Sequence, residues 1–244
     1  MDWIPAFAGM TVVGLTNHIY IWLGMSALIL VFFYRLFIVI DMKLLNIVIL
    51  ILFASLSYAQ SSEEERQILL SPLADDFILG NKSAPVTIIE YSSLSCPSCA
   101  FFHDAIFDDI KANYIDTGKV RFIHRNYPLN EAAMRAAIVP ICAGKDKYFI
   151  FLKSLFETQS SWMNNKSALQ SIAALGGMPK QQLAKCMADK TIENQLLQSR
   201  LDAHNILEIN ATPTFFINGE KISGVPGKEN IYKIIDQKLA DAKK

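Results

Sequence analysis

The stretch VTIIEYSSLSCPSC, residues 86–99, decides the fold of this chain. Its first part, Val86 to Tyr91, consists mostly of β-branched and aromatic residues and is predicted to form a strand. The motif Cys96-Pro97-Ser98-Cys99 follows, and its proline suits the first turn of a helix because that position needs no backbone N–H donor. The sequence therefore predicts a cysteine pair at the start of a helix, just beyond the carboxyl end of a strand.

Outward from the cysteines, the helix is predicted to continue to about Asp116 and to end at Gly118. Apolar residues recur on one side of it at helical spacing, namely Phe102, Ile106, Phe107, Ile110 and Tyr114. A second strand is expected over Val120 to Tyr127. Two strands joined by a helix form a parallel pair, and ligands bind at the carboxyl edge of such a sheet. The cysteines are expected at that edge.

The remainder of the chain adds helices and a hairpin. Five helices are expected between the second strand and the hairpin, over residues 131–142, 145–157, 166–175, 179–189 and 191–205. A hairpin is expected around Asn218-Gly219, with strands over 214–217 and 221–223, and a last helix over 228–241. The predicted class is α/β: residues 76–128 and 207–244 form a mixed central sheet flanked by helices, and residues 129–206 form an inserted all-helical subdomain.

The charge balance excludes one class of function. The chain has 23 basic and 23 acidic side chains, so its charges cancel and nothing in the composition favours nucleic-acid binding. The charges are unevenly distributed, since residues 1–59 contain only Asp2, Arg35, Asp41 and Lys43. Residues 60–244 are long enough for one domain with a proper core, and we expect a monomer.

Residues 42–59 have the pattern of a secretory signal peptide. Lys43 precedes an apolar run, Leu44 to Phe53, and Ser57-Tyr58-Ala59 fits the small-x-small cleavage pattern. A periplasmic location is therefore expected for the rest of the chain, which begins with a flexible leader over residues 60–75.

Residues 1–41 leave two alternatives open. Translation starts at Met42, which we favour because a complete export signal begins there, and the apolar extension before it is a mis-annotated start. Alternatively, the apolar stretch over residues 19–40 is an uncleaved anchor that holds the protein at the membrane, facing the periplasm.

The four cysteines, Cys96, Cys99, Cys142 and Cys186, all lie in the exported part. Backbone N–H groups converge at a helix start and favour a thiolate at Cys96, and Cys99 lies one turn further on. The same spacing could be half of a zinc site, but there is no second C-x-x-C motif, so we expect neither metal nor cofactor. The sequence allows two alternatives for Cys142 and Cys186: they are either disulfide partners or two buried free thiols.

Further residues around the motif divide into site candidates and structural residues. Glu90 is expected to be buried on the strand and to exchange a proton with Cys99, the alternative being a strand-end glutamate that reaches solvent. His103, four residues after Cys99, is expected to be a solvated surface histidine. Structural roles are expected for His124, Arg125, Trp162 and His204.

The motif, Glu90 and the segment ATPTFF at 211–216 together resemble the DsbA family of bacterial thiol:disulfide oxidoreductases. The resemblance spans about residues 76–241 and includes YIDTGKVRF at 114–122. It implies a thioredoxin-like fold with a helical insertion and a cis bond at Thr212-Pro213 that faces the cysteines. It further implies the following site roles: Cys96 as nucleophile, Cys99 as its partner, and Cys142 and Cys186 as a structural disulfide.

The family implies an exported enzyme that introduces disulfides into newly translocated, cysteine-containing proteins. A membrane quinone-linked partner of the DsbB type would reoxidise it. The alternatives are a disulfide reductase or isomerase, and a non-enzymatic metal-binding module that uses the cysteine pair. Ser98 stands where the best-known members have histidine, so we predict that Cys96 is acidic but less extremely so, which makes a milder oxidant.

Overall fold

The computed structural model describes residues 34, 44–53, 60 and 63–243. The chain divides into two units, Met1–Ser61 and Ser62–Lys244. In the first unit, residues 44–53 form an exposed helix. No helix among the described residues is long and apolar enough to cross a membrane. Most of the apolar stretch at 19–40 and the ends of the predicted signal peptide at 42–59 lie outside the described residues.

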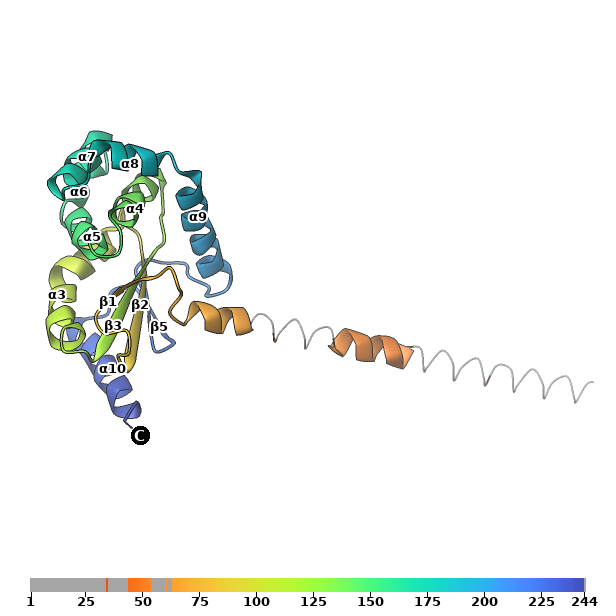
Figure 1. Cartoon of the computed structure of the whole chain (residues 1–244). Coiled ribbons are helices and arrows are strands. Elements are labelled where there is room, and N and C mark those ends of the chain that lie inside the picture. The colour runs from red at the N-terminus through yellow and green to blue at the C-terminus, as the bar shows by residue number, and fades with distance from the viewer. Residues whose placement is uncertain (1–33, 35–43, 54–59, 61–62, 244) are drawn as a thin grey trace, which may run out of the picture. The chain divides into compact units, whose positions relative to one another are not determined.

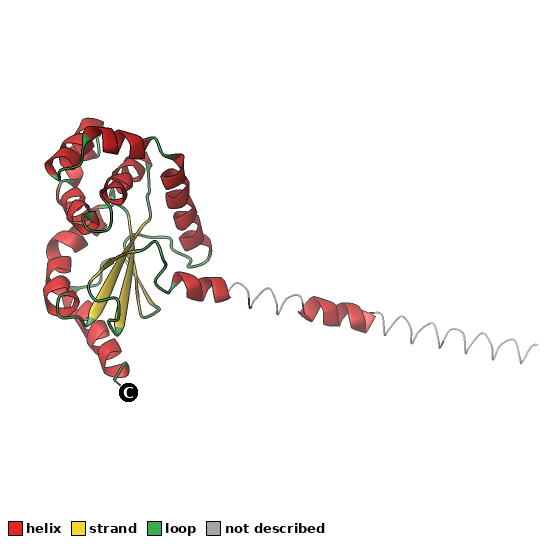
Figure 2. Ribbon diagram, in the orientation of Figure 1, coloured by secondary structure: helices red, strands yellow, loops and turns green. Residues whose placement is uncertain are grey.

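The second unit is built on a five-stranded sheet with the order β1-β3-β2-β4-β5. The strands are β1 (Phe77–Leu79), β2 (Val86–Ser92), β3 (Val120–Asn126), β4 (Thr214–Ile217) and β5 (Glu220–Ser223). β2 and β3 are parallel, whereas β1, β4 and β5 each pair antiparallel with their neighbours. The predicted mixed sheet flanked by helices is confirmed, as Figures 1 and 2 show. The short strand β1 was not predicted.

The helical run after the cysteines is continuous but not regular. It consists of α2 (Pro97–Phe102), η1 (His103–Phe107), α3 (Asp108–Ile110) and η2 (Lys111–Ile115), in which the two η segments are π-helical. Gly118 ends the run with a φ of +75°, a left-handed conformation that glycine adopts without a steric penalty. The single helix predicted from the sequence is therefore interrupted by two π-turns, a feature that often accompanies functional sites.

The inserted subdomain is helical, as predicted. Its helices are α4 (Glu131–Ala143), α5 (Tyr148–Glu157), α6 (Gln159–Trp162), α7 (Lys166–Leu175), α8 (Lys180–Met187) and α9 (Lys190–Asn205), and α10 (Lys228–Asp241) follows the hairpin. A disulfide between Cys142 and Cys186, with Cα atoms 6.1 Å apart, joins the end of α4 to α8. This confirms the pairing that the family resemblance implies and excludes two free thiols.

Apolar clusters cover both faces of the sheet. On one face Ile88 and Phe122 pack with side chains of the run after the cysteines and with Ile231 and Ile235 of α10. On the other face a second cluster forms, which contains Ile89, Tyr91, Ile123, Ala203, Leu207 and Phe216. A third cluster fills the helical insertion and includes both Cys96 and Cys99. The insertion thus contributes directly to the surroundings of the cysteines.

The stretch predicted as a flexible leader, residues 60–75, is partly helical and bonded to the sheet. Residues 63–69 form a helix. The Arg125 guanidinium on β3 donates hydrogen bonds to the Leu69 and Ser71 carbonyls and to both carboxylate oxygens of Asp76, at 2.9 and 2.8 Å. A buried guanidinium needs partners for all its donors. Leu69 and Ser71 accept two of the five hydrogen bonds of Arg125, Asp76 accepts two more, and the Tyr91 hydroxyl accepts the fifth. The sequence did not reveal this because it does not show that Arg125 points inward.

Candidate active site

Cys96 and Cys99 lie at the start of α2, at the carboxyl end of β2. Cys96 is the N-cap residue with an extended backbone, and Pro97 occupies the first helical turn, as predicted. Both cysteines are free thiols. Cys96 keeps 8% of its surface exposed and Cys99 none, whereas Pro97 and Ser98 are exposed. A partner in solution can therefore reach the first sulfur but not the second.

The loop before β4 faces this cysteine pair. The Thr212-Pro213 peptide bond is cis, as the family resemblance implies. The Cys96 Sγ lies 3.3 Å from the Thr212 carbonyl oxygen, to which the thiol form donates a hydrogen bond. Antiparallel pairing of β4 with β2, with Thr214 opposite Tyr91, brings the loop to this place. Residues more than a hundred positions apart in sequence thus form one site.

The surroundings separate the pKa values of the two thiols. The pKa of Cys96 falls from 9.0 to about 5, chiefly because the Cys99 thiol hydrogen-bonds to it, with further bonds from the Thr212 side chain and from the backbone N–H groups of Cys99 and Ser98. Burial opposes this shift. The pKa of Cys99 is raised by its own burial, by its hydrogen bond to Cys96 and by the negative charge of Glu90. At neutral pH the Cys96 sulfur is a thiolate and the more deeply buried Cys99 sulfur is a thiol.

Glu90 lies on β2 beneath the cysteines. Its side chain is fully buried, which excludes the alternative of a solvent-reaching glutamate. The carboxylate Oε2 lies 2.9 Å from the His103 Nε2. The other oxygen, Oε1, has no hydrogen-bond partner within the described part of the chain. A buried carboxylate oxygen without a hydrogen-bond partner is an uncommon arrangement in folded proteins.

The prediction that His103 is a solvated surface residue is wrong. His103 is 6% exposed, and its ring stacks on Phe156 of α5 with the ring centres 4.2 Å apart. Positions 99, 103, 106 and 110 follow helical spacing, so His103 belongs to the buried stripe that the apolar residues define. Polarity alone led to the wrong assignment, since the partner that makes burial possible, Glu90, lies on another element.

His124 and Tyr148 extend this buried polar cluster. The His124 ring contacts Ser92 Oγ at 2.8 Å through Nε2 and the Tyr148 hydroxyl at 2.7 Å through Nδ1. Asn126 donates to the same hydroxyl at 3.1 Å. Burial lowers the pKa of His124 to about 4, against the attraction of Glu90, so this ring is neutral at neutral pH. The strand register, in which Glu90 is opposite His124, brings the two together.

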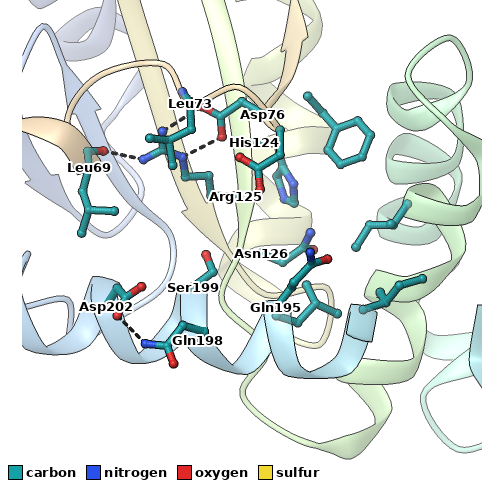
Figure 3. Close-up of a pocket in the computed structure, with 15 residues that line it drawn as sticks. Leu69, Leu73, Asp76, His124, Arg125, Asn126, Gln195, Gln198, Ser199 and Asp202 are labelled. Carbon is teal, nitrogen blue, oxygen red and sulfur yellow. Dashed lines mark hydrogen bonds and ion pairs between the residues drawn. The ribbon is translucent and has the colours of Figure 1, made fainter. Parts of the chain in front are cut away.

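A cavity of about 430 Å³ lies beside this cluster, between the stretch before β1, the end of β3 and α9 (Figure 3). His124, Arg125 and Asn126 line it from the sheet, and Gln195 and Gln198 line it from α9. Neither cysteine of the active-site motif lines it. Within the described residues no group of three or more histidine, cysteine, aspartate or glutamate side chains could hold a metal ion.

Comparisons with known proteins agree with this geometry. A family model described as thioredoxin matches residues 73–237. The structure is similar to the crystal structure of alpha-DsbA1 from Wolbachia pipientis, with a TM-score of 0.69, 34% identity, and coverage of 73% of this chain and 97% of that one. BdbD from Bacillus subtilis is also similar, with a TM-score of 0.62, 25% identity, and coverage of 68% and 93%. The chain belongs to the DsbA family of thioredoxin-fold proteins.

Curated relatives give the same result at the level of sequence. A Rickettsia prowazekii protein, provisionally named protein-disulfide oxidoreductase, is 33% identical over 174 residues, which are 70% of this chain and 64% of that protein. Disulfide bond formation protein D of Bacillus subtilis is 29% identical over 170 residues, 66% of this chain and 76% of that protein. The chain thus spans slightly less than two thirds of the rickettsial relative.

Proposed function

We propose that this protein is a thiol:disulfide oxidoreductase that transfers the disulfide of Cys96 and Cys99 to cysteine-containing proteins. The observation that carries the proposal is the asymmetry of the two sulfurs. Cys96 is partly exposed with a pKa of about 5, and Cys99 is buried with a raised pKa. A low pKa makes Cys96 a good leaving group, and this favours release of an oxidised substrate.

The exchange proceeds in two steps. A substrate thiolate attacks the Cys96 sulfur, which is the accessible one, and Cys99 leaves with the electron pair of the broken bond. The second substrate thiol then attacks the substrate sulfur of this mixed disulfide. The Cys96 thiolate is expelled, the substrate leaves with a new disulfide, and the protein is left as a dithiol. No cofactor takes part in either step.

Two features support a polypeptide substrate. The backbone before Pro213 faces Cys96, and in this position it can pair with an extended segment in the manner of an added strand. Pro97 is exposed beside the nucleophile, and Phe101, two residues after Cys99, is 58% exposed. Newly exported proteins that are still unfolded present extended apolar segments of this kind, and they are the proposed substrates.

The proposed direction is oxidation rather than reduction or isomerisation. A stabilised thiolate in the dithiol form makes the disulfide form the stronger oxidant. Repeated turnover then needs reoxidation by a membrane quinone-linked partner of the DsbB type. The proposed site of action is the periplasm, to which the export signal at residues 42–59 would direct the chain. Sequencing the amino terminus of the native protein tests the export signal, because cleavage would follow Ala59.

The test of activity uses the full chain, oxidised, with a peptide that contains two cysteines. The wild-type protein is expected to form the peptide disulfide, and Cys96→Ser is expected to abolish it. Cys99→Ser, which cannot hold the disulfide itself, is mixed instead with the peptide in its disulfide form: the Cys96 thiolate attacks the peptide disulfide, one peptide sulfur leaves as a thiol, and a mixed disulfide at Cys96 should accumulate, visible by mass spectrometry. Equilibration in glutathione buffers gives the reduction potential, and a potential as low as that of thioredoxin would contradict the oxidase direction. Unchanged peptide oxidation by Cys96→Ser would contradict the proposed function itself.

A further inference from the structure

The buried partner of Glu90 is His103, whose side chain has no part in the exchange steps described so far. The pair is sealed from solvent, with side-chain exposures of 0% for Glu90 and 4% for His103. His103 is the first residue of η1, directly after α2, the helix that contains Cys99. It lies four positions after Cys99, about one helical turn along the same side of the run.

The exchange chemistry creates a charge close to this pair. When the Cys96–Cys99 bond breaks, its electron pair remains on the Cys99 sulfur, which has no exposed surface. Burial and the negative charge of Glu90 both disfavour a thiolate there. The leaving sulfur must therefore gain a proton, and no solvent reaches it directly.

We infer that His103 is a positioning residue that keeps one exchangeable proton on the Glu90–His103 pair for transfer to Cys99. The inference rests on the proposed function. In this step the bond between the substrate sulfur and the Cys96 sulfur forms, and the Cys96–Cys99 bond breaks. The substrate sulfur is oxidised to the disulfide level and Cys99 is reduced. The proton leaves the pair for the Cys99 sulfur, and it returns to the pair when the Cys96–Cys99 disulfide is formed again.

The other titratable groups that face the Glu90–His103 pair do not supply this proton. From β3, His124 lies with its ring centre 6.4 Å from that of His103, and it is neutral at neutral pH because burial lowers its pKa to about 4. From α5, Tyr148 has a raised pKa because of burial and the charge of Glu90, so its hydroxyl does not ionise. From α2, Cys99 is the acceptor. The free Oε1 of Glu90 leaves one carboxylate oxygen available to pass the proton on.

The stacking of His103 on Phe156 and its bond to Glu90 fix the imidazole in one orientation. The imidazole next to the carboxylate gives the pair a second group that can carry the proton. Removing the imidazole is therefore expected to change the pH at which the proton becomes unavailable, in addition to the rate.

The experiment measures the first exchange step as a function of pH. The full chain, oxidised, is mixed with an excess of a peptide that has one thiol, the reaction is quenched with acid, and release of the Cys99 thiol is followed by mass spectrometry after alkylation. Each rate is divided by the ionised fraction of the peptide thiol. In the wild-type protein this corrected rate is expected to fall on the alkaline side.

In His103→Gln, which keeps N–H donors for Glu90 but has no titratable ring, the dependence of the corrected rate on pH is expected to change. The corrected rate at pH 8 is expected to be about tenfold lower, which is less than the roughly 10²–10⁴-fold contribution of a general acid because Glu90 remains in place. The matched control is His204→Gln, at an exposed histidine of α9, which should leave the profile unchanged. A rate that His103→Gln lowers by one factor at every pH would show a purely structural role and overturn the inference.

A second measurement does not depend on whether His103→Gln folds. The corrected rate of the wild-type protein is expected to be slower in D₂O than in H₂O, because a proton moves in the step that releases Cys99. Equal rates would overturn the inference. If the wild-type protein forms no mixed disulfide at all, the proposed function fails as well, and this outcome is distinct from an active wild type whose profile His103→Gln leaves unaltered.

Discussion

The Thr212 carbonyl oxygen and the Cys96 sulfur lie 3.3 Å apart, although 116 positions separate the two residues in the sequence. This contact joins the two halves of the sheet domain, which the helical insertion separates in the chain. It places a backbone acceptor and a partly exposed nucleophile side by side at the carboxyl end of β2. The Thr212 side chain in the same loop helps to lower the pKa of Cys96.

The first prediction concerns pH. The pKa of Cys96 in the folded dithiol form is about 5, below its ordinary value of 9.0, so the thiolate stabilises the folded state fully above about pH 9 and this stabilisation is lost as the pH falls through 5. Cys99 stays protonated across this window because its pKa is raised. Denaturant unfolding of the dithiol form should show stability falling from pH 9 to pH 5. Cys96→Ser should show a weaker dependence, and equal slopes would contradict the assignment.

The second prediction concerns Ser98, which is exposed between the two cysteines. Ser98→His introduces a side chain that can be positively charged next to the thiolate. We expect the Cys96 pKa to fall by about one unit. This makes the dithiol form more stable by a factor of about ten in the exchange equilibrium, which raises the reduction potential of the protein by about 30 mV. Thiolate absorbance and equilibration with glutathione measure the two quantities. Ser98→Asn, polar but uncharged, is the control, and an equal shift in that variant would argue against a charge effect.

The third prediction concerns the ion pair that holds the stretch before β1. Asp76→Asn leaves the buried Arg125 guanidinium without its anion, and breaking a buried pair in this way costs about 3 to 5 kcal/mol of unfolding free energy. Asp116→Asn is the matched control, because Asp116 pairs with Lys111 on the surface and such pairs contribute about 1 kcal/mol or less. Equal losses in the two variants would show that Arg125 is not effectively buried.

The fourth prediction concerns the disulfide in the insertion. Replacing Cys142 and Cys186 together by alanine is expected to lower the unfolding free energy by about 2 to 5 kcal/mol, since the link closes a long loop. The Cys96 titration should remain where it is, because neither residue of this disulfide contributes to the lowered pKa. A shifted Cys96 titration in the double variant would reveal coupling between the insertion and the active site.

Local patterns predicted most of the elements correctly because each depends on neighbouring residues. Strand β2, the helix start at Cys96 and the last helix follow from propensity, capping and periodicity. Strand β1 was missed because it has only three residues and exists through its pairing with β3. The stretch over residues 60–75 was misjudged for a related reason, since its order depends on bonds to Arg125 that no local pattern reveals.

The sequence by itself determined that a cysteine pair with Pro97 between its members starts a helix after a buried strand, and this favours thiol–disulfide exchange. Tertiary structure alone decided which sulfur is nearer the surface, how far the two pKa values separate, and that His103 lies inside against Glu90. The physical reason is that ionisation depends on burial, charges and hydrogen bonds from groups distant in the chain, such as Thr212 and Phe156. Their positions are set only when the sheet and the insertion pack together.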